Sequence, residues 1–467
     1  MTEKKRGLSR RDFLGLSIGT AAGALLAACG PTPTPQVITE QVEVTRVVEV
    51  EGETVVETVI EQVEVTAPPP ETVELRLAEG SWVGPEGIAY WTDDIIPRFE
   101  GENPGIKVAW ESAESPDYED KLYTQAVAGD APDVFFIWWS AGLMEEGQLL
   151  PLEEHFDDEY LADFYPANVV GMVYEGHLYG VPKYANAIAM AYNKTILDEA
   201  GVDHPDGSWD WDDFLAACEA TTDPDKGQWG TYVMHEWGQP AQYVWMNGGQ
   251  WMNADLFGTK CLLDEDKAME ALKFLHDMIY GPNPVSPQPG GMGDFGWWDV
   301  FSSGKIAFAE SASWTVTNYM RDNDFDWDFT DMLAAPDGSR ATVTYVNHYS
   351  AYAGTQHPAE AVKLVEFLAS PWANKQGALG ILGSQPARKS VVPTWDNDSM
   401  GARAGYDVAA LTRSMDHARL LPIFKDDKQI LTEIFNPIWD QIWVTGEMGL
   451  EEGIQLIVDR IDDHFAS

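Results

Sequence analysis

The chain has 467 residues, of which 76 are acidic and 29 are basic, giving a formal net charge of −47. This balance argues against nucleic acid as a partner, because binding to phosphates needs a basic surface. Nineteen tryptophans are the other unusual feature of the composition. An indole offers a flat apolar face and one N–H donor, so tryptophans outside the core would suit ligands that are partly apolar and partly polar, such as sugars.

Residues 1–28 have the layout of an export signal, since basic residues precede a short run of small and apolar residues from Phe13 to Ala28. This run is shorter than the roughly 20 residues that a membrane-spanning helix needs. The segment SRRDFL resembles a twin-arginine signal, and LAAC at the end of the run resembles a bacterial lipobox. The resemblance implies that cleavage leaves Cys29 as a lipidated N-terminus. The alternative is an export signal with an incidental cysteine.

Residues 29–70 are low in complexity. Valine and glutamate alternate from residue 42 to residue 66, a pattern that by itself suggests a strand. The segment contains no aromatic residue and has an acidic excess, so a packed core is not expected. We predict that residues 29–70 form the lipidated N-terminus and a disordered stalk, which would hold a globular part away from a membrane.

Strand-like and helix-like segments alternate after residue 70. Residues 73–79 are predicted to form a strand, residues 102–112 a turn and a strand, and residues 115–129 a helix. Residues 131–139 are almost continuously apolar, as in a strand that is buried on both faces. This order predicts an α/β fold with a largely parallel sheet. The segment is too long for one small core, which favours two lobes.

Several segments in this region resemble the extracellular solute-binding proteins that serve bacterial sugar importers and include the maltose-binding proteins. The similar segments are, in order, NPGIKV, AGDAPDV, EEGQLLPLEE, YEGHLYGVPKYANAIAMAYNK, WDWDDF, MNGGQWMN, FSSGKIAFAESASW, AEAVKLVEFLAS and EEGIQLIVDRI. The similarity covers essentially all of residues 71–467 and rests on the order of these segments. It implies a two-lobe α/β fold in which the ligand binds in a cleft between the lobes.

The resemblance also implies where the lobes begin and end. The first lobe would comprise residues 71–182 and 340–384, and the second lobe residues 185–332 and 385–467. The chain would cross between the lobes near residues 180–185, 334–340 and 383–388. Each of these three stretches contains a proline, namely Pro182, Pro336 and Pro386.

Ligands of open α/β sheets bind beyond the carboxyl ends of the strands, so the loops at those ends carry the candidates of the first lobe. Trp82 follows the first predicted strand, and Trp138 and Trp139 end the fourth segment described above. Adjacent strand residues point to opposite faces, so at most one of this pair should contact the ligand, and we favour Trp139. Asn347 and His348 follow residues 341–346 near the second crossing and are weaker candidates.

In the second lobe, the resemblance implies contacts from Tyr184 and Asn186, which flank the first crossing together with Lys183, and from Glu236 and Trp237. Glu236 could accept hydrogen bonds from two sugar hydroxyls, although a surface carboxylate fits the sequence equally well. Trp251 could form one wall of the site beside residues 247–249.

Trp314 stands where the family commonly has a tryptophan two residues after a glycine, but here Ala312 replaces that glycine. We expect Trp314 to stack on the ligand, with a packed core indole as the alternative.

The sequence therefore predicts a substrate-binding lipoprotein of an ABC transporter. It would capture a carbohydrate outside the cytoplasmic membrane or in the periplasm, and deliver it as a monomer to the permease subunits. One alternative is a receptor for a polyamine or another small solute, held by acidic and aromatic groups. Another is a membrane-anchored glycosidase, which would need two carboxylates at a defined separation.

Neither a phosphate-binding loop nor a metal-ligand spacing is present, so no cofactor or metal is expected. Cys218 and Cys261 could pair in an oxidising compartment, and the sequence leaves their pairing open.

Overall fold

The computed structural model describes residues 37–50, 53–66, 72–80, 85–113, 118–138, 141–236, 238–293, 295–296, 298–380 and 383–466. The predicted signal, Cys29, Trp82, Trp139 and Trp237 lie outside these residues. The chain forms two units, Met1–Thr72 and Val73–Ser467. Within the described residues, no helix combines the length and the apolar character that crossing a membrane requires.

The first unit contains a β-hairpin. Strands β1 (Val37–Val50) and β2 (Glu53–Thr66) pair antiparallel, from Val37 opposite Thr66 to Val50 opposite Glu53. The prediction of a disordered stalk is therefore wrong for these two segments. Alternating β-branched residues favour extended backbone, and two strands can pair their backbone groups without a buried core. The alternation of valine and glutamate was the better guide here than the lack of aromatic residues.

The first lobe of the second unit is built on a six-stranded sheet. The strands follow the order β15-β14-β5-β3-β4, and β8 pairs with β14 beside this path. Their bounds are β3 Val73–Glu79, β4 Ile106–Ser112, β5 Val134–Ile137, β8 Val181–Ala187, β14 Thr342–Ala351 and β15 Ala418–Leu420. Strand β3 is parallel to β4 and β5, as predicted, but β14 runs antiparallel to β5 and β8. The sheet is thus mixed, because β14 enters it from the second lobe.

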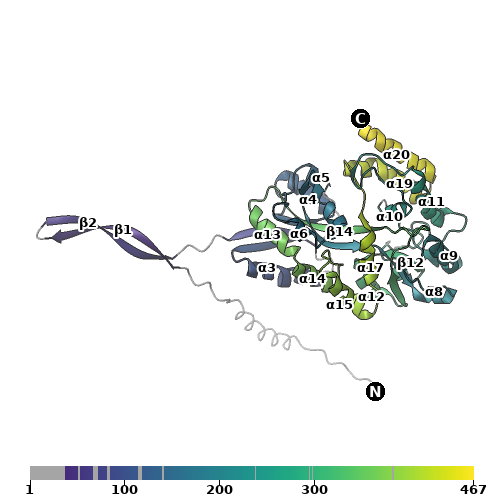
Figure 1. Ribbon diagram of the computed structural model, residues 1–467, viewed down its shortest axis with the longest axis horizontal. Helices are drawn as coiled ribbons and strands as arrows, with labels where there is room; N and C mark the ends of the chain where they lie inside the picture. The colour runs from purple at the N-terminus through teal and green to yellow at the C-terminus, as the bar shows by residue number, and fades with distance from the viewer. Residues whose placement is uncertain are drawn as a thin grey trace, which may run out of the picture. The chain divides into compact units, whose positions relative to one another are not determined.

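The first lobe has its own core on this sheet. All four residues of β5 are fully buried, as its apolar sequence predicts for a strand covered on both faces. Helices α3, α4, α5, α13 and α14 belong to this lobe and span Ile96–Glu102, Tyr118–Ala128, Ala141–Glu145, Pro358–Leu368 and Pro371–Leu379. Figure 1 shows α3 and α13 at the end of the second unit opposite to α8, α9 and α11.

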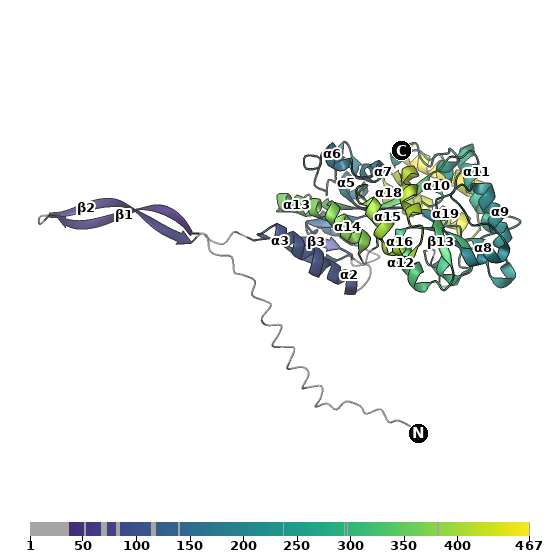
Figure 2. The ribbon, with the colours of Figure 1, turned by 60° about the horizontal axis from the view of Figure 1, so that its bottom comes forward.

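The second lobe is built on a four-stranded sheet with the order β10-β12-β9-β13. These strands span Trp229–Thr231, Ile306–Ser311, Ala189–Asn193 and Trp327–Thr330 in that order. Helices α8 (Lys194–Ala200), α9 (Trp211–Thr221), α10 (Ala241–Met246), α11 (Asp266–Tyr280), α12 (Ser313–Asp322), α19 (Asn436–Trp443) and α20 (Leu450–Ala466) belong to it. Figure 2 shows α8, α9 and α11 grouped at the end of the second lobe.

Helix α9 packs very closely on strand β10. A Cβ atom at Gly230 would lie 2.4 Å from the Cα of Cys218, so this contact requires glycine. Cys218 and Cys261 are both buried and both free. The disulfide that the sequence left open is therefore not formed.

The chain passes from the first sheet to the second at Ile188, between β8 and β9. This point lies beyond residues 180–185, where the first crossing was expected. The return runs between β13 and β14, which brackets the expected crossing at residues 334–340. Strand β15 was expected in the second lobe, but it pairs with β14 in the first sheet. A short strand such as β15 pairs with a long neighbouring strand, and its own sequence contains little information about which strand that will be.

Candidate functional site

A cavity of about 770 Å³ lies where the two lobes meet. Strands β8 and β14 and the end of β15 line it from the first lobe, and Glu236, Trp298 and helix α12 line it from the second. The described lining residues are Trp138, Gly171, Lys183, Tyr184, Asn186, Glu236, Trp298, Trp314, Thr317, Asn318, Thr344, Tyr345, Val346, Asn347, His348, Ser384, Leu420, Leu421 and Ile423. A cavity of this size accommodates a small ligand.

Polar groups on β8 and β14 form one wall of the cavity. The pairing of these strands shifts register between Asn347 and His348, and both residues line the cavity beside this irregularity. Each is 2% exposed. The Asn347 Nδ2 and the His348 Nδ1 have no hydrogen-bond partner among the described residues. Both atoms are themselves buried, so these two residues reach the cavity through other atoms.

The His348 ring is held in one form. Its Nε2 lies 2.7 Å from the backbone oxygen of Asn168, and a carbonyl can only accept, so Nε2 carries the hydrogen. Burial lowers the pKa of His348 to about 4. The ring is therefore neutral near pH 7, and its Nδ1 is an acceptor.

Behind the same wall lies a buried ion pair. Lys183 Nζ on β8 is 2.5 Å from Glu79 Oε1 at the end of β3, and both side chains are almost completely buried. Burial raises the pKa of Glu79 and lowers that of Lys183, in each case against the attraction of the partner. Lys183 also lies 4.8 Å from the centre of the Phe136 ring.

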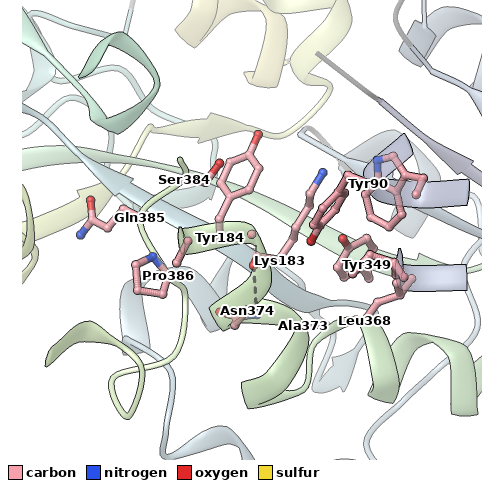
Figure 3. A pocket seen from close by; sticks show the side chains of 14 residues that line it. Tyr90, Lys183, Tyr184, Tyr349, Leu368, Ala373, Asn374, Ser384, Gln385 and Pro386 are labelled. Carbon is pink, nitrogen blue, oxygen red and sulfur yellow. Dashed lines mark hydrogen bonds between the residues drawn. The ribbon is translucent and has the colours of Figure 1, made fainter. Parts of the chain in front are cut away.

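Figure 3 shows this lysine in a recess of about 30 Å³, with Tyr184 on one side and Tyr90 and Tyr349 on the other. The side-chain amide of Asn374 donates to the backbone oxygen of Lys183, which fixes the strand at this point. Lys183 and Tyr184 line both the recess and the large cavity.

Three aromatic rings meet in the lining, with Trp298 and Trp314 from the second lobe and Tyr345 from β14 of the first lobe. Trp298 and Trp314 have ring centres 4.8 Å apart and planes at 80°, and Trp314 and Tyr345 have centres 5.4 Å apart and planes at 81°. Trp298 and Tyr345 complete the set at 6.1 Å and 82°. The three planes are close to mutually perpendicular, so the rings form a corner rather than one flat platform. We call Trp298, Trp314 and Tyr345 the aromatic corner.

Glu236 lies in the same lining as the aromatic corner. Glu236 is exposed to solvent at the cavity. Desolvation by the neighbouring protein, together with the charge of Asp440, raises the pKa of Glu236 to about 7. Glu236 also raises the pKa of Tyr345, after the larger effect of burial, so its charge reaches the aromatic corner.

The structure brings six predicted site residues into one cavity lining: Tyr184, Asn186, Glu236, Trp314, Asn347 and His348. Asn186 is additionally held by a hydrogen bond from the Ser313 hydroxyl. Trp82, Trp139 and Trp237 lie outside the described residues.

Trp251 does not fit its predicted place in the wall. It is 1% exposed and packs against Phe435 and Trp439, in the core of the second lobe. These partners come from the C-terminal part of the chain. Trp251 fills the space between them, which a local pattern of sequence could not indicate.

Sequence reasoning missed Trp298 and Tyr345 and favoured Trp139 over Trp138, which lines the cavity. A signal existed for Tyr345, because it is two residues before the candidate Asn347, and alternate strand residues share a face. Trp298 follows another tryptophan in a stretch with no regular secondary structure, so its direction has no sequence signal.

The part of the chain that the structure describes contains no group of three or more His, Cys, Asp or Glu side chains that could hold a metal ion. The family described as bacterial extracellular solute-binding protein matches residues 84–375.

A putative binding protein of Brucella abortus is 27% identical over 307 residues, which cover 63% of this chain and 72% of the relative. An arabinooligosaccharide-binding protein of Halalkalibacterium halodurans is 26% identical over 253 residues, covering 51% and 56% of the two chains. Among solved structures, an ABC substrate-binding protein of Listeria monocytogenes in complex with cycloalternan superposes with a TM-score of 0.72. It is 23% identical, and the match covers 85% of this chain and 100% of the other. This structural likeness confirms the two-lobe α/β fold.

Proposed function

Because the chain belongs to the bacterial extracellular solute-binding proteins, we propose that it is the receptor of an ABC importer and that it binds a carbohydrate in the cavity between its lobes. The receptor would act as a monomer, close around the sugar and present it to the permease subunits. The family is extracellular, so the protein is exported.

The observation that carries this proposal is the pairing of two kinds of surface in one cavity. The aromatic corner offers apolar faces for the C–H groups of a sugar. The same lining contains the polar side chains of Thr317 and Asn318, and a hydroxyl and an amide can donate to and accept from sugar hydroxyls. The name of the Halalkalibacterium relative points to the same class of ligand.

The cavity supports binding better than glycoside hydrolysis. Hydrolysis uses two carboxyl groups that flank the scissile bond. Among the described residues that line the cavity, Glu236 is the one carboxylate. We therefore favour a receptor over the glycosidase alternative.

Calorimetry of the purified protein with a panel of neutral mono- and oligosaccharides tests the carbohydrate proposal. We expect one sugar or sugar series to bind saturably in a one-to-one complex, and chromatography of the mixture to recover it unchanged. Release of a shorter sugar would overturn the receptor role. If neither this panel nor an amino-substituted sugar binds, the carbohydrate assignment fails.

We further propose that residues 1–28 are a twin-arginine signal and that Cys29 is lipidated after cleavage, so that the protein is held at the membrane surface. One acyl chain binds a membrane only marginally, so stable anchoring implies more than one chain on this residue. Replacing Cys29 by serine should move the protein from the membrane fraction to the soluble fraction or leave the precursor uncleaved. The Cys218→Ala variant is the matched control and should remain in the membrane fraction. Wild-type protein without an acyl mass on Cys29 would refute the anchor.

A further inference from the structure

The aromatic corner has a geometry that stacking of a neutral sugar does not require. A sugar ring stacks on one flat face, but Trp298, Trp314 and Tyr345 all line the cavity with their planes nearly perpendicular and in edge-to-face contact. A cation is attracted to the face of an aromatic ring when it lies within about 6 Å of the ring centre. Faces that meet in a corner can act on one cation together.

The charges around the corner have one sign. Glu236 lines the cavity beside the three rings, and its carboxylate forms no hydrogen bond or ion pair with the described residues. The negative charges of Glu236 and Glu310 both raise the pKa of Tyr345, and the negative charge of Asp440 raises the pKa of Glu236. A ligand that enters the cavity displaces the water around Glu236, and a carboxylate that loses water without gaining a partner is costly.

The cavity lining contains no basic group that could supply this partner from within the described residues. Lys183 is the one lysine or arginine among them, and it is already paired with Glu79 at 2.5 Å. His348 is neutral near pH 7 because burial lowers its pKa to about 4. When Glu236 is ionised, the positive charge that complements it would therefore come with the ligand.

We propose that the aromatic corner and Glu236 form a subsite for a positively charged nitrogen, so that the ligand is an amino-substituted sugar rather than a neutral one. This inference rests on the binding role proposed above and narrows its substrate class. The ammonium group lies against the three rings and pairs with Glu236. The sugar hydroxyls face polar side chains of the same lining, such as Thr317 and Asn318.

Two matched pairs of probes test the subsite by calorimetry on the full chain. The first pair is choline and 3,3-dimethylbutan-1-ol, which have the same shape but differ in charge. The second pair is the glucosamine disaccharide and its N-acetylated form, which is neutral. We expect the charged member of each pair to bind at least tenfold more tightly than the neutral member.

The Glu236→Gln variant keeps the size of the side chain and removes its charge. It should weaken binding of the charged probes about tenfold more than binding of the neutral probes. The control is Glu451→Gln, which makes the same change of net charge on the exposed face of α20 and should alter neither.

The outcomes separate this inference from the proposed function. If neutral sugars bind as tightly as their amino counterparts and Glu236→Gln changes nothing, the cation subsite is wrong and the carbohydrate receptor stands. If choline binds and no sugar of either kind does, the subsite is supported and the carbohydrate assignment fails. If no probe of either pair binds, the inference is overturned, and the panel of neutral sugars decides the proposed function separately.

Discussion

The two walls of the cavity differ in whether their charged groups are paired. In the first lobe, Lys183 and Glu79 are almost completely buried and neutralise each other, and Asn347 and His348 of the same wall are neutral. In the second lobe, Glu236 lines the cavity together with Trp298 and Trp314 and has no ion-pair partner among the described residues. The charged groups of the first wall are paired with each other, whereas Glu236 of the second wall would gain its partner from a bound ligand.

This difference separates the parts that hold the site from the parts that select its ligand. The paired charges join β3 to β8, and Lys183 is further tied to α14 through Asn374. Disturbing them should act on stability. Disturbing the aromatic corner should act on affinity, because its rings face a cavity rather than the core. The following predictions test this division, beginning with the largest effect.

Replacing Lys183 by methionine should be the most destabilising change. It leaves the Glu79 carboxylate buried without its partner, and breaking a buried pair costs about 3–5 kcal/mol. Chemical denaturation should show this loss, and the double variant Glu79→Gln, Lys183→Met should recover most of it. Lys194→Met is the control, since its pair with Asp328 is more exposed and should matter less. A loss of similar size in the control would mean that burial does not set the cost.

The Glu310→Gln variant tests a buried carboxyl of the second lobe. Glu310 accepts hydrogen bonds from Tyr243 and Gln242, yet burial raises its pKa from 4.5 to about 7. At a pH between these two values, the Glu310 carboxyl is protonated in the folded state and ionised in the unfolded state. The free energy of unfolding of the wild type therefore falls as the pH rises from about 4.5 to 7. Glutamine does not titrate, and the variant should gain on the order of 3 kcal/mol relative to wild type between pH 5 and pH 8.

Denaturation curves at both pH values measure this gain. Glu366→Gln is the control, because it makes the same substitution at an exposed position of α13 and should change the free energy of unfolding little. An equal difference at pH 5 and pH 8 for Glu310→Gln would contradict a raised pKa.

Truncating Trp314 to alanine should reduce affinity more than stability. The ring is half-buried and faces the cavity, and losing one aromatic anchor costs about 2 kcal/mol of binding free energy, or roughly thirtyfold in Kd. Calorimetry with the best ligand measures the loss. The control is Trp209→Ala, a half-buried tryptophan that packs on Phe308 outside the cavity lining. It should bind the ligand as wild type does, and a comparable loss there would place the site elsewhere.

The smallest effect is expected at an exposed ion pair. Asp120 of α4 and Lys428 of α18 (Asp427–Gln429) form this pair, with 2.6 Å between Oδ1 and Nζ. Their side chains are 71% and 75% exposed, so water screens the pair. Lys428→Gln should change the free energy of unfolding by less than about 1 kcal/mol, and less still in high salt. A loss above about 2 kcal/mol in denaturant would show that this exposed pair stabilises the fold about as much as a buried one.

Much of the fold could be predicted because its signals are local. The apolar run before Trp138 identified a strand buried on both faces, and the order of family-like segments identified two lobes and six residues of the cavity. The failures came from distant partners. The antiparallel entry of β14 and the addition of β15 depend on how the lobes connect. Trp251 and Trp298 are both tryptophans in irregular stretches, and only the surrounding structure decides that one fills a core and the other faces a cavity.

The thiols of Cys218 and Cys261 can be used to measure how often the second lobe unfolds. Cys218 and Cys261 are completely buried, and burial raises the pKa of Cys261 to about 12 and that of Cys218 well above its ordinary value. A thiol reacts as its thiolate, so a reagent in solution must wait until the second lobe unfolds around them. The rate of their modification therefore measures the frequency of that unfolding. A ligand that closes the lobes should slow the modification of these thiols in proportion to its occupancy. This measurement needs no attached dye.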